Sequence, residues 1–287
     1  MRGVSLLAAL SILLVSAWSM ARADASELDG VLALAREKAA AVDLMRNKAA
    51  DVLSTVAQDR LFATYLNATT QGEGIRIRTR IEQALATFIR RFGFNAFQLI
   101  DRSGVVITYV SKAKTRTDMT VDLGKDLVLA AGFAQKAPGA RPVVVRRSNT
   151  SNWTVSHVAP VSWRGQTEYV LRAEQDGAAY QRVLRLGING KRYVVLADEL
   201  GQVLSDSRSS GRVGAERPTF QLTIAGQSLS ALRRSFGGNA SEGSGRVKLG
   251  NENFFVSYRK SGNWTVIAVE PVVPPRRCMK DGDRLCG

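Results

Sequence analysis

Histidine and cysteine are almost absent from this chain of 287 residues, and their scarcity limits the chemistry it can perform. The one histidine, His157, lies in an alternating strand pattern without a nearby arrangement of nucleophile and acid that it could activate. No group of ligand residues has the spacing of a metal site. The sequence therefore predicts a protein that is not an enzyme and that carries no cofactor and no metal.

The two cysteines, Cys278 and Cys286, lie within the last ten residues, so neither belongs to a predicted core. In an oxidising compartment they can form a disulfide that closes a small loop. Such a bond would restrain the basic tail, residues 274–287, without cross-linking the folded core.

Long apolar runs are also missing, except at the N-terminus. Residues Val4 to Ala17 have the length of the apolar part of a signal peptide, and the small residues Ala21 and Ala23 suit cleavage. We therefore expect residues 1–23 to be a signal peptide and the protein to be periplasmic or secreted. The alternative is an uncleaved N-terminal membrane anchor, because the run to Met20 reaches the lower limit for a bilayer span.

Acidic residues are few relative to basic ones, 25 against 40, which gives a formal charge of +15. Such an excess favours anionic surfaces or ligands. The basic residues are scattered as pairs without interleaved aromatic residues, a distribution unlike that of a nucleic-acid-binding platform. The sequence does not indicate a nucleic-acid partner.

A long amphipathic helix is predicted from residue 26 to about residue 67, followed by a polar break with Gly72 and Gly74 in a loop and a second helix over 75–92. Alanine at two of five heptad positions would make a weak coiled-coil seam, so we expect the apolar stripe to pack on a sheet of the same chain. A homodimer through the long helix is the alternative. The heptad positions are Leu28, Ala35, Val42, Ala49 and Val56.

Two apolar segments around a polar turn organise the rest of the chain. Residues 94–109 predict a β-hairpin, with Asp101 capping backbone amides in the turn. The same order of strand, Asp/Gly turn and strand is repeated at residues 190–205. We therefore expect an α+β fold with two successive modules. Further strands are predicted at 142–146, 153–161, 168–175, 246–249, 253–260 and 264–270. Further helices are predicted at 123–136 and 177–186, and a loop with a helix over 217–236.

The chain resembles the double Cache (dCache) family, the PAS-like extracytoplasmic sensor domains of bacterial chemoreceptors, sensor kinases and diguanylate cyclases. The resemblance covers about residues 26–271. It rests on the long helix and on three short segments, Phe97 to Gly104, Tyr169 to Asp176 and Gly262 to Val269.

The resemblance implies a long N-terminal helix with two tandem PAS-like modules, each an antiparallel sheet with flanking helices. The leading helices occupy residues 24–90, the membrane-distal module with the ligand pocket 91–186, and the second module 187–273. The segment 111–125 lacks the Arg-x-Trp-Tyr type motif of the amino-acid-binding branch.

Side chains alternate along the strand from Tyr169 to Gln175, so Arg172 and Glu174 share one face. The resemblance places Glu174 where many such sensors carry the acid that binds the ligand, which suits an ammonium or amine. Arg172, or Arg147, could hold a carboxylate through paired N–H donors. The alternative is that Arg172 and Glu174 satisfy each other or face solvent. Candidate pocket walls are Tyr109, Trp153 and His157.

These features together predict an exported sensor that binds a small polar molecule, anionic or zwitterionic, and signals through a membrane-bound receptor or kinase. One alternative is a ligand-free interaction module that docks through its basic surface. Another is a remnant of a transmembrane chemoreceptor or sensor kinase, because residues 274–287 stand where family receptors continue into a transmembrane helix.

Overall fold

The computed structural model describes residues 4–112, 115–116, 119–122, 126–134, 143–146, 153–198, 201, 203–208, 223–224, 227–228, 241–249 and 251–272, with side chains from Ala25 onward for most of them. The chain divides into two compact units. One is formed by Ala40–Leu186 and Val203–Phe220, and the other by Met1–Ala39, Gly187–Gln202 and Gln221–Gly287.

The long N-terminal helix is present as α1 (Val4–Ala57). The heptad residues Ala35, Val42, Ala49 and Val56 are buried, so the apolar stripe packs within the chain as predicted. Among the residues from Ala25 onward whose side chains are described, no helix has an apolar stretch long enough to cross a membrane.

The helix ends about ten residues earlier than the predicted boundary near residue 67. A short turn interrupts it, and the Asp59 carboxylate accepts a hydrogen bond from the Leu61 amide at 2.9 Å, which caps a separate helix, α2 (Arg60–Leu66). The apolar periodicity continues through this turn, so periodicity alone could not reveal the break.

The second predicted helix begins earlier than expected, as α3 (Gln71–Phe92). Gly72 and Gly74, which were predicted to form a loop, lie in its first turns, so that prediction was wrong. Thr70 accepts a hydrogen bond from the Glu73 amide at 3.2 Å, and the Glu73 carboxylate accepts one from the Thr69 amide at 3.2 Å. These two bonds satisfy one donor of the first helical turn and one donor just before the helix, and they offset the poor helix propensity of glycine.

The predicted hairpin is confirmed as β1 (Phe94–Asp101) and β2 (Val105–Ser111). Asp101 caps its turn as expected, because its carboxylate accepts hydrogen bonds from the amides of Ser103 and Val105 at 2.9 Å. Gly104 has a φ of 86°, a conformation that glycine adopts without strain.

The hairpin belongs to a seven-stranded antiparallel sheet with the order β3-β2-β1-β7-β6-β5, in which β4 also pairs with β2. The other strands are β3 (Thr115–Arg116), β4 (Met119–Thr120), β5 (Val143–Arg146), β6 (Trp153–Trp163) and β7 (Gln166–Asp176).

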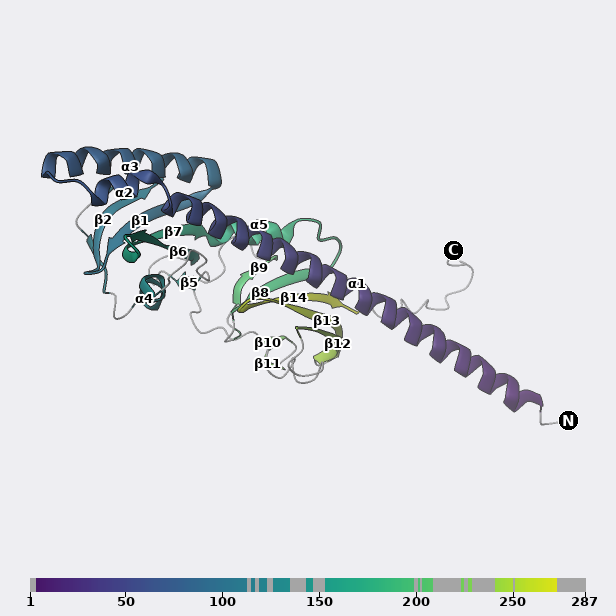
Figure 1. The fold of residues 1–287 in the computed structure, drawn as a ribbon. Helices are drawn as coiled ribbons and strands as arrows, with labels where there is room; N and C mark the ends of the chain where they lie inside the picture. The colour runs from purple at the N-terminus through teal and green to yellow at the C-terminus, as the bar shows by residue number, and fades with distance from the viewer. Residues whose placement is uncertain are drawn as a thin grey trace. The chain divides into compact units, whose positions relative to one another are not determined.

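Helices cover both faces of this sheet. Figure 1 shows α2 and α3 on one side of the strands and α4 (Leu127–Ala134) on the other. The side of α2 and α3 carries the larger core, to which Leu53 of α1, Ile81 of α3 and Leu171 of β7 belong. On the side of α4 a second core forms from Ile100, Val106, Val128, Leu129, Val158 and Val170.

Helix α5 (Gly177–Arg185) follows β7 directly and packs on β9 (Val203–Asp206) within the same unit. Its N-terminus is capped by Asp176, whose carboxylate accepts a hydrogen bond from the Ala178 amide at 2.9 Å. The indole of Trp153 lies near the Tyr180 ring of this helix, with ring centroids 5.6 Å apart and the ring planes tilted by 37°.

Gly177 leaves no room for a side chain, because a Cβ at this position would overlap Cε2 of the Trp153 indole. We expect Gly177→Ala to lower the free energy of unfolding by about 1–3 kcal/mol through overpacking, as measured by urea denaturation. Gly72→Ala is the matched control, since a Cβ there would have nothing within 4 Å. Equal stabilities of the two variants would contradict the clash.

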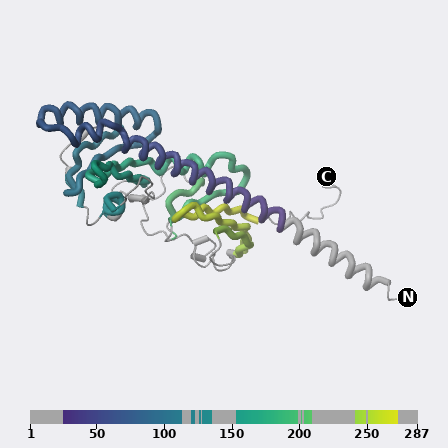
Figure 2. Tube along the Cα trace, in the orientation of Figure 1, coloured from purple at the N-terminus to yellow at the C-terminus, as the bar shows by residue number. Residues whose placement is uncertain are grey.

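The other unit contains an antiparallel sheet in which β12, β13, β14 and β8 lie in that order. Figure 2 traces these strands from green to yellow. Within the segment 217–236, where a loop and a helix are predicted, the structure describes two short paired strands, β10 (Thr223–Ile224) and β11 (Gln227–Ser228), which the sequence did not predict. The sheet strands are β8 (Tyr193–Ala197), β12 (Glu242–Leu249), β13 (Glu252–Ser261) and β14 (Trp264–Pro271).

Ion pairs join the first described part of α1 to this second sheet. Glu242 of β12 accepts hydrogen bonds from Arg36 of α1 at 2.9 Å and from Arg259 of β13 at 2.7 Å. The bond from Arg36 is the main cause that lowers the pKa of Glu242 to about 2. Arg192 bridges Glu27 and Glu270 in the same way. The N-terminal helix is therefore held on the sheet by charges as well as by its apolar stripe.

Candidate functional site

Buried polar side chains gather on the face of the seven-stranded sheet that α4 covers. Residues directly opposite on antiparallel neighbours lie on one side of a sheet, and Gln98 of β1 pairs with both Tyr109 of β2 and Arg172 of β7. Ser156 of β6 lies opposite Glu174. The structure thus brings together three candidates selected from the sequence, Tyr109, Arg172 and Glu174.

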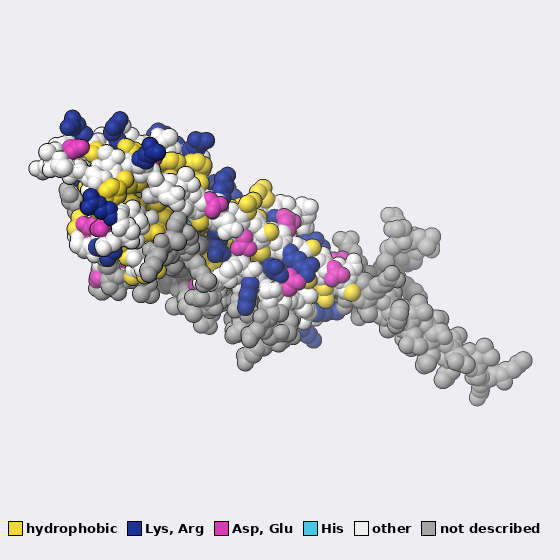
Figure 3. Space-filling view, in the orientation of Figure 1, with side chains coloured by type: hydrophobic (Ala, Val, Ile, Leu, Met, Phe, Trp, Pro, Cys, Tyr) yellow, Lys and Arg dark blue, Asp and Glu magenta, His cyan; other side chains and the backbone are white. Residues whose placement is uncertain are grey.

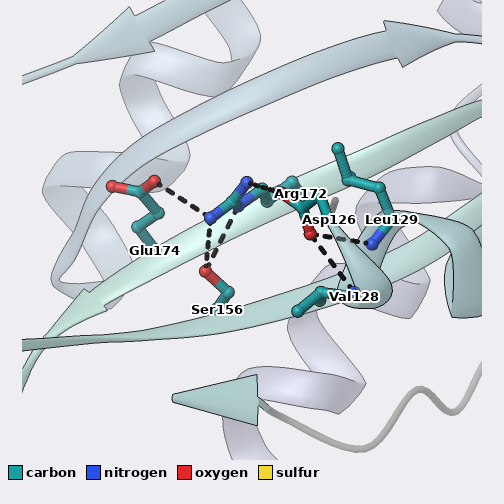
Figure 4. Close-up of polar contacts among 6 residues, drawn as sticks. All are labelled: Asp126, Val128, Leu129, Ser156, Arg172 and Glu174. Carbon is teal, nitrogen blue, oxygen red and sulfur yellow. Dashed lines mark hydrogen bonds and ion pairs between the residues drawn. The ribbon is translucent and has the colours of Figure 1, made fainter. Parts of the chain in front are cut away.

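Arg172 is the centre of this group, as Figure 4 shows. Its Nη1 donates to Asp126 Oδ2 at 2.9 Å, and its Nε and Nη2 donate to Ser156 Oγ at 3.2 and 3.1 Å. Only 7% of Arg172 is exposed. These contacts fix the plane of the guanidinium, because its donors are arranged as a rigid fork.

Asp126 connects the guanidinium to α4. Its Oδ1 accepts hydrogen bonds from the amides of Val128 and Leu129, each at 3.2 Å, while its Oδ2 accepts the hydrogen bond of Arg172. The same carboxylate therefore caps the first turn of α4 and ties the helix to β7.

Glu174 brings a second carboxylate to the group. Its Oε1 lies 3.8 Å from Nη2 of Arg172, within ion-pair range but beyond a hydrogen bond, and only 4% of the residue is exposed. The alternative in which Arg172 and Glu174 face solvent is wrong, because both are buried. One guanidinium between the carboxylates of Asp126 and Glu174 leaves these three side chains with a formal charge of −1.

Gln98 is a residue of this face that the sequence reasoning missed. It is buried, and among the described residues no hydrogen-bond donor lies within reach of its side-chain oxygen. A buried acceptor without a donor is costly in a folded protein. The available signal was the polar residue between Phe97 and Leu99 within the apolar run from Ala96 to Ile100.

Trp153 and His157 lie on the opposite face, toward α5. Nε2 of His157 lies 3.0 Å from Gln175 Oε1, which also accepts a hydrogen bond from the Tyr180 hydroxyl at 3.0 Å. His157 is 1% exposed, and its burial lowers the pKa of the imidazole to about 4; the bond to Gln175 opposes this shift and the charge of Arg46 adds to it. The two residues therefore do not border the group around Arg172.

Three other candidates lie outside the described residues, namely Arg147, Cys278 and Cys286. Their assignments as a carboxylate partner and as a disulfide stay predictions. Tyr109 is half-buried and packs at the border of the core under α4.

A small apolar cavity of about 10 Å³ lies between α1, α2 and α3, away from this group. Its volume is about that of one water molecule, and its lining includes Phe62, Leu85 and Phe88. It is too small and too apolar to be the site of a polar ligand.

No family model and no curated protein sequence matches the chain. Solved structures do match it. The sensory domain of the Campylobacter jejuni chemoreceptor Tlp3 with isoleucine bound has a TM-score of 0.65 and 14% identity, and the match covers 86% of this chain and 93% of that one. These neighbours are dCache domains. The chain has the double-Cache fold.

Two further double-Cache structures support the same assignment of the fold. The ligand-binding domain of the Pseudomonas aeruginosa chemoreceptor PctC in complex with GABA has a TM-score of 0.57 and 17% identity, with 85% of this chain and 99% of that one covered. The sensor domain of the Vibrio cholerae histidine kinase DctB has a TM-score of 0.59 and 14% identity, with 87% and 98% covered. At these identities the likeness is one of fold.

Proposed function

We propose that the chain is an exported sensor whose module over residues 91–186 binds a small molecule bearing an ammonium group, with Glu174 and Gln98 as its acceptors. The observation that carries this proposal is the side-chain oxygen of Gln98, a buried acceptor on the same sheet face as the buried carboxylate of Glu174. Glu174 is a buried carboxylate, and the side-chain oxygen of Gln98 has no donor among the described residues.

An ammonium group suits both features of this face. It supplies three donors, so it can bond to Glu174 and to Gln98 at once. It also carries one positive charge, which offsets the formal charge of −1 on Asp126, Arg172 and Glu174. A purely anionic ligand would add to that negative charge in a buried place, so we favour a cationic or zwitterionic molecule.

Arg172 has a different role in this proposal from the carboxylate partner predicted from the sequence. Asp126 and Ser156 already use donors on all three of its nitrogen atoms. We propose that it positions Glu174 and α4 at the edge of the site. Arg147 remains the candidate for a ligand carboxylate.

The neighbouring structures support this class of ligand. Tlp3 binds isoleucine and PctC binds GABA in their crystal structures, and each of these molecules contains an amino and a carboxyl group. We further propose that residues 1–23 direct export, that the module over 187–273 supports the first, and that a membrane-bound receptor or kinase receives the signal.

Thermal-shift measurements on the purified chain test the proposal with matched sets of amines, amino acids and carboxylates of equal chain length, for example butylamine, GABA and butyrate. At least one ammonium-bearing compound is expected to raise the melting temperature, by several degrees at about 100 times its Kd. Glu174→Gln should weaken the binding of that compound at least about tenfold, because the variant loses a charge-assisted hydrogen bond. Shifts by carboxylates alone would contradict the proposal.

Two variants separate binding from folding in this test. Glu168→Gln removes a carboxylate from the same strand at a partly exposed position and should bind like the wild type. Gln98→Leu should weaken binding while leaving the ligand-free protein equally stable or more stable, because it removes a buried acceptor without a donor. A Gln98→Leu variant that binds normally would exclude Gln98 from the site.

A further inference from the structure

The outward face of α3 carries a row of exposed arginines, Arg76, Arg80, Arg90 and Arg91. With 3.6 residues per turn these positions fall on one side of the helix, opposite the buried residues Ile81 and Leu85. Figure 3 shows dark blue Lys and Arg side chains along α3. We call these four residues the arginine row.

The two acidic residues of α3 do not neutralise the arginine row. Glu73 accepts a hydrogen bond from the Thr69 amide at the helix N-terminus. Glu82 accepts one from the Thr108 hydroxyl at 2.9 Å and lies 3.9 Å from Arg78, which is not part of the row. Within the described part of the chain no carboxylate forms an ion pair with an arginine of the row, whereas Arg36, Arg172 and Arg192 all have carboxylate partners.

The chemistry of the arginine row favours phosphate groups. All basic residues of α3 are arginines, whose planar fork donates two parallel bonds to one phosphate. Arg91 lies fifteen positions after Arg76, so the row extends over about 22 Å along the helix. A row of this length can contact several phosphates of an extended anionic surface at the same time.

A large apolar side chain lies beside the arginine row. Ile75 is 48% exposed and is one of three large hydrophobic residues, with Leu44 and Leu186, that stand exposed in the described part of the chain. An exposed isoleucine next to basic residues suits the boundary between lipid headgroups and acyl chains. A soluble polyanion would give Ile75 no apolar partner.

We propose that the arginine row docks the protein on anionic phospholipid headgroups, with Ile75 entering the headgroup region. This surface lies on the helix that packs against the sheet face opposite α4, so it is separate from the proposed ligand site. The inference does not depend on the identity of the ligand.

Sedimentation with phospholipid vesicles tests the docking of the whole chain. The protein should bind vesicles of phosphatidylglycerol and phosphatidylcholine, bind pure phosphatidylcholine vesicles much less, and be released by about 0.5 M salt. Replacing the four arginines of the row by glutamine should lower the partition coefficient at least about tenfold, because each basic residue near an anionic surface contributes to binding. Glutamine is a good helix former, so α3 should stay intact.

A second quadruple variant controls for net charge. It replaces four exposed basic residues elsewhere by glutamine, namely Arg182, Lys191, Arg246 and Lys248. The partition coefficient of this control variant should fall by no more than about threefold. Equal losses in the two variants, failure of the wild type to bind phosphatidylglycerol vesicles, or binding to soluble polyphosphate in preference to vesicles would each overturn the proposal.

Discussion

Replacing Arg172 with methionine is expected to lower the free energy of unfolding by about 3–5 kcal/mol at pH 7. Methionine fills a similar volume but leaves the carboxylates of Asp126 and Glu174 without the cation that they share. A buried charge without a partner is far more costly than a buried pair. The loss would appear in urea or guanidinium unfolding curves as a lower midpoint with an unchanged slope.

Neutralising the remaining carboxylates should restore much of this loss. The triple variant Arg172→Met, Asp126→Asn, Glu174→Gln replaces the whole ionic group by neutral side chains, and such replacements are often neutral in stability. Arg182→Met is the matched control, because that arginine is exposed on α5 and its loss should change stability by no more than about 0.5 kcal/mol. A loss below about 1 kcal/mol for Arg172→Met would contradict a structural role for the guanidinium.

Acidification from pH 6.5 to pH 4 is expected to destabilise the protein through His157 by about 3 kcal/mol. Burial lowers the pKa of His157 to about 4 in the folded chain, against 6.5 for an unperturbed imidazole. Between these values the unfolded chain binds the proton and the folded chain does not, so the free energy of unfolding falls as the pH falls. Below pH 4 both states bind the proton and the loss is complete.

The chain contains a single histidine, so its imidazole resonance can be assigned and titrated without ambiguity by NMR. We expect its midpoint near pH 4, and a midpoint near 6.5 would refute the predicted effect. His157→Gln provides the second measurement. The difference in stability between wild type and variant should shrink or change sign as the pH falls from 6.5 to 4, and the titration of carboxylates such as Glu242 largely cancels in that difference.

The local spacing of apolar and polar residues along the sequence predicted most of the fold. The hairpin over 94–109 and the sharing of one face by Arg172 and Glu174 follow from the two-residue period of a strand, and the contacts of Arg172 agree with it. The contact between Arg172 and Asp126 spans 46 residues and depends on where α4 begins, so no short-range pattern could predict it. The break at Asp59 was hidden because the apolar period continues across it.

The position of His157 illustrates why the rest of the site was not predictable. At the turn, Ser162 pairs with Thr167, and the same register continued along the hairpin would place His157 opposite Arg172. A bulge between Val161 and Ser162 shifts the pairing by one residue, so His157 instead lies opposite Ala173. A shift of one residue moves every side chain to the other face of the sheet. The residue types at positions 161 and 162 do not predict this bulge.

With the register that the bulge sets, β6 and β7 separate two groups of buried polar side chains, one on each face of the sheet. The side chains of Ser156 and Glu174 lie on the face toward α4. Those of the next residues, His157 and Gln175, lie on the opposite face. Glu174 and Gln175 are joined by one rigid peptide unit, and the side-chain oxygen of Gln175 accepts a hydrogen bond from the Tyr180 hydroxyl of α5. A movement of the backbone at Glu174 would therefore change the position of this acceptor. The site proposed under α4 is therefore connected to α5 through two consecutive residues of β7.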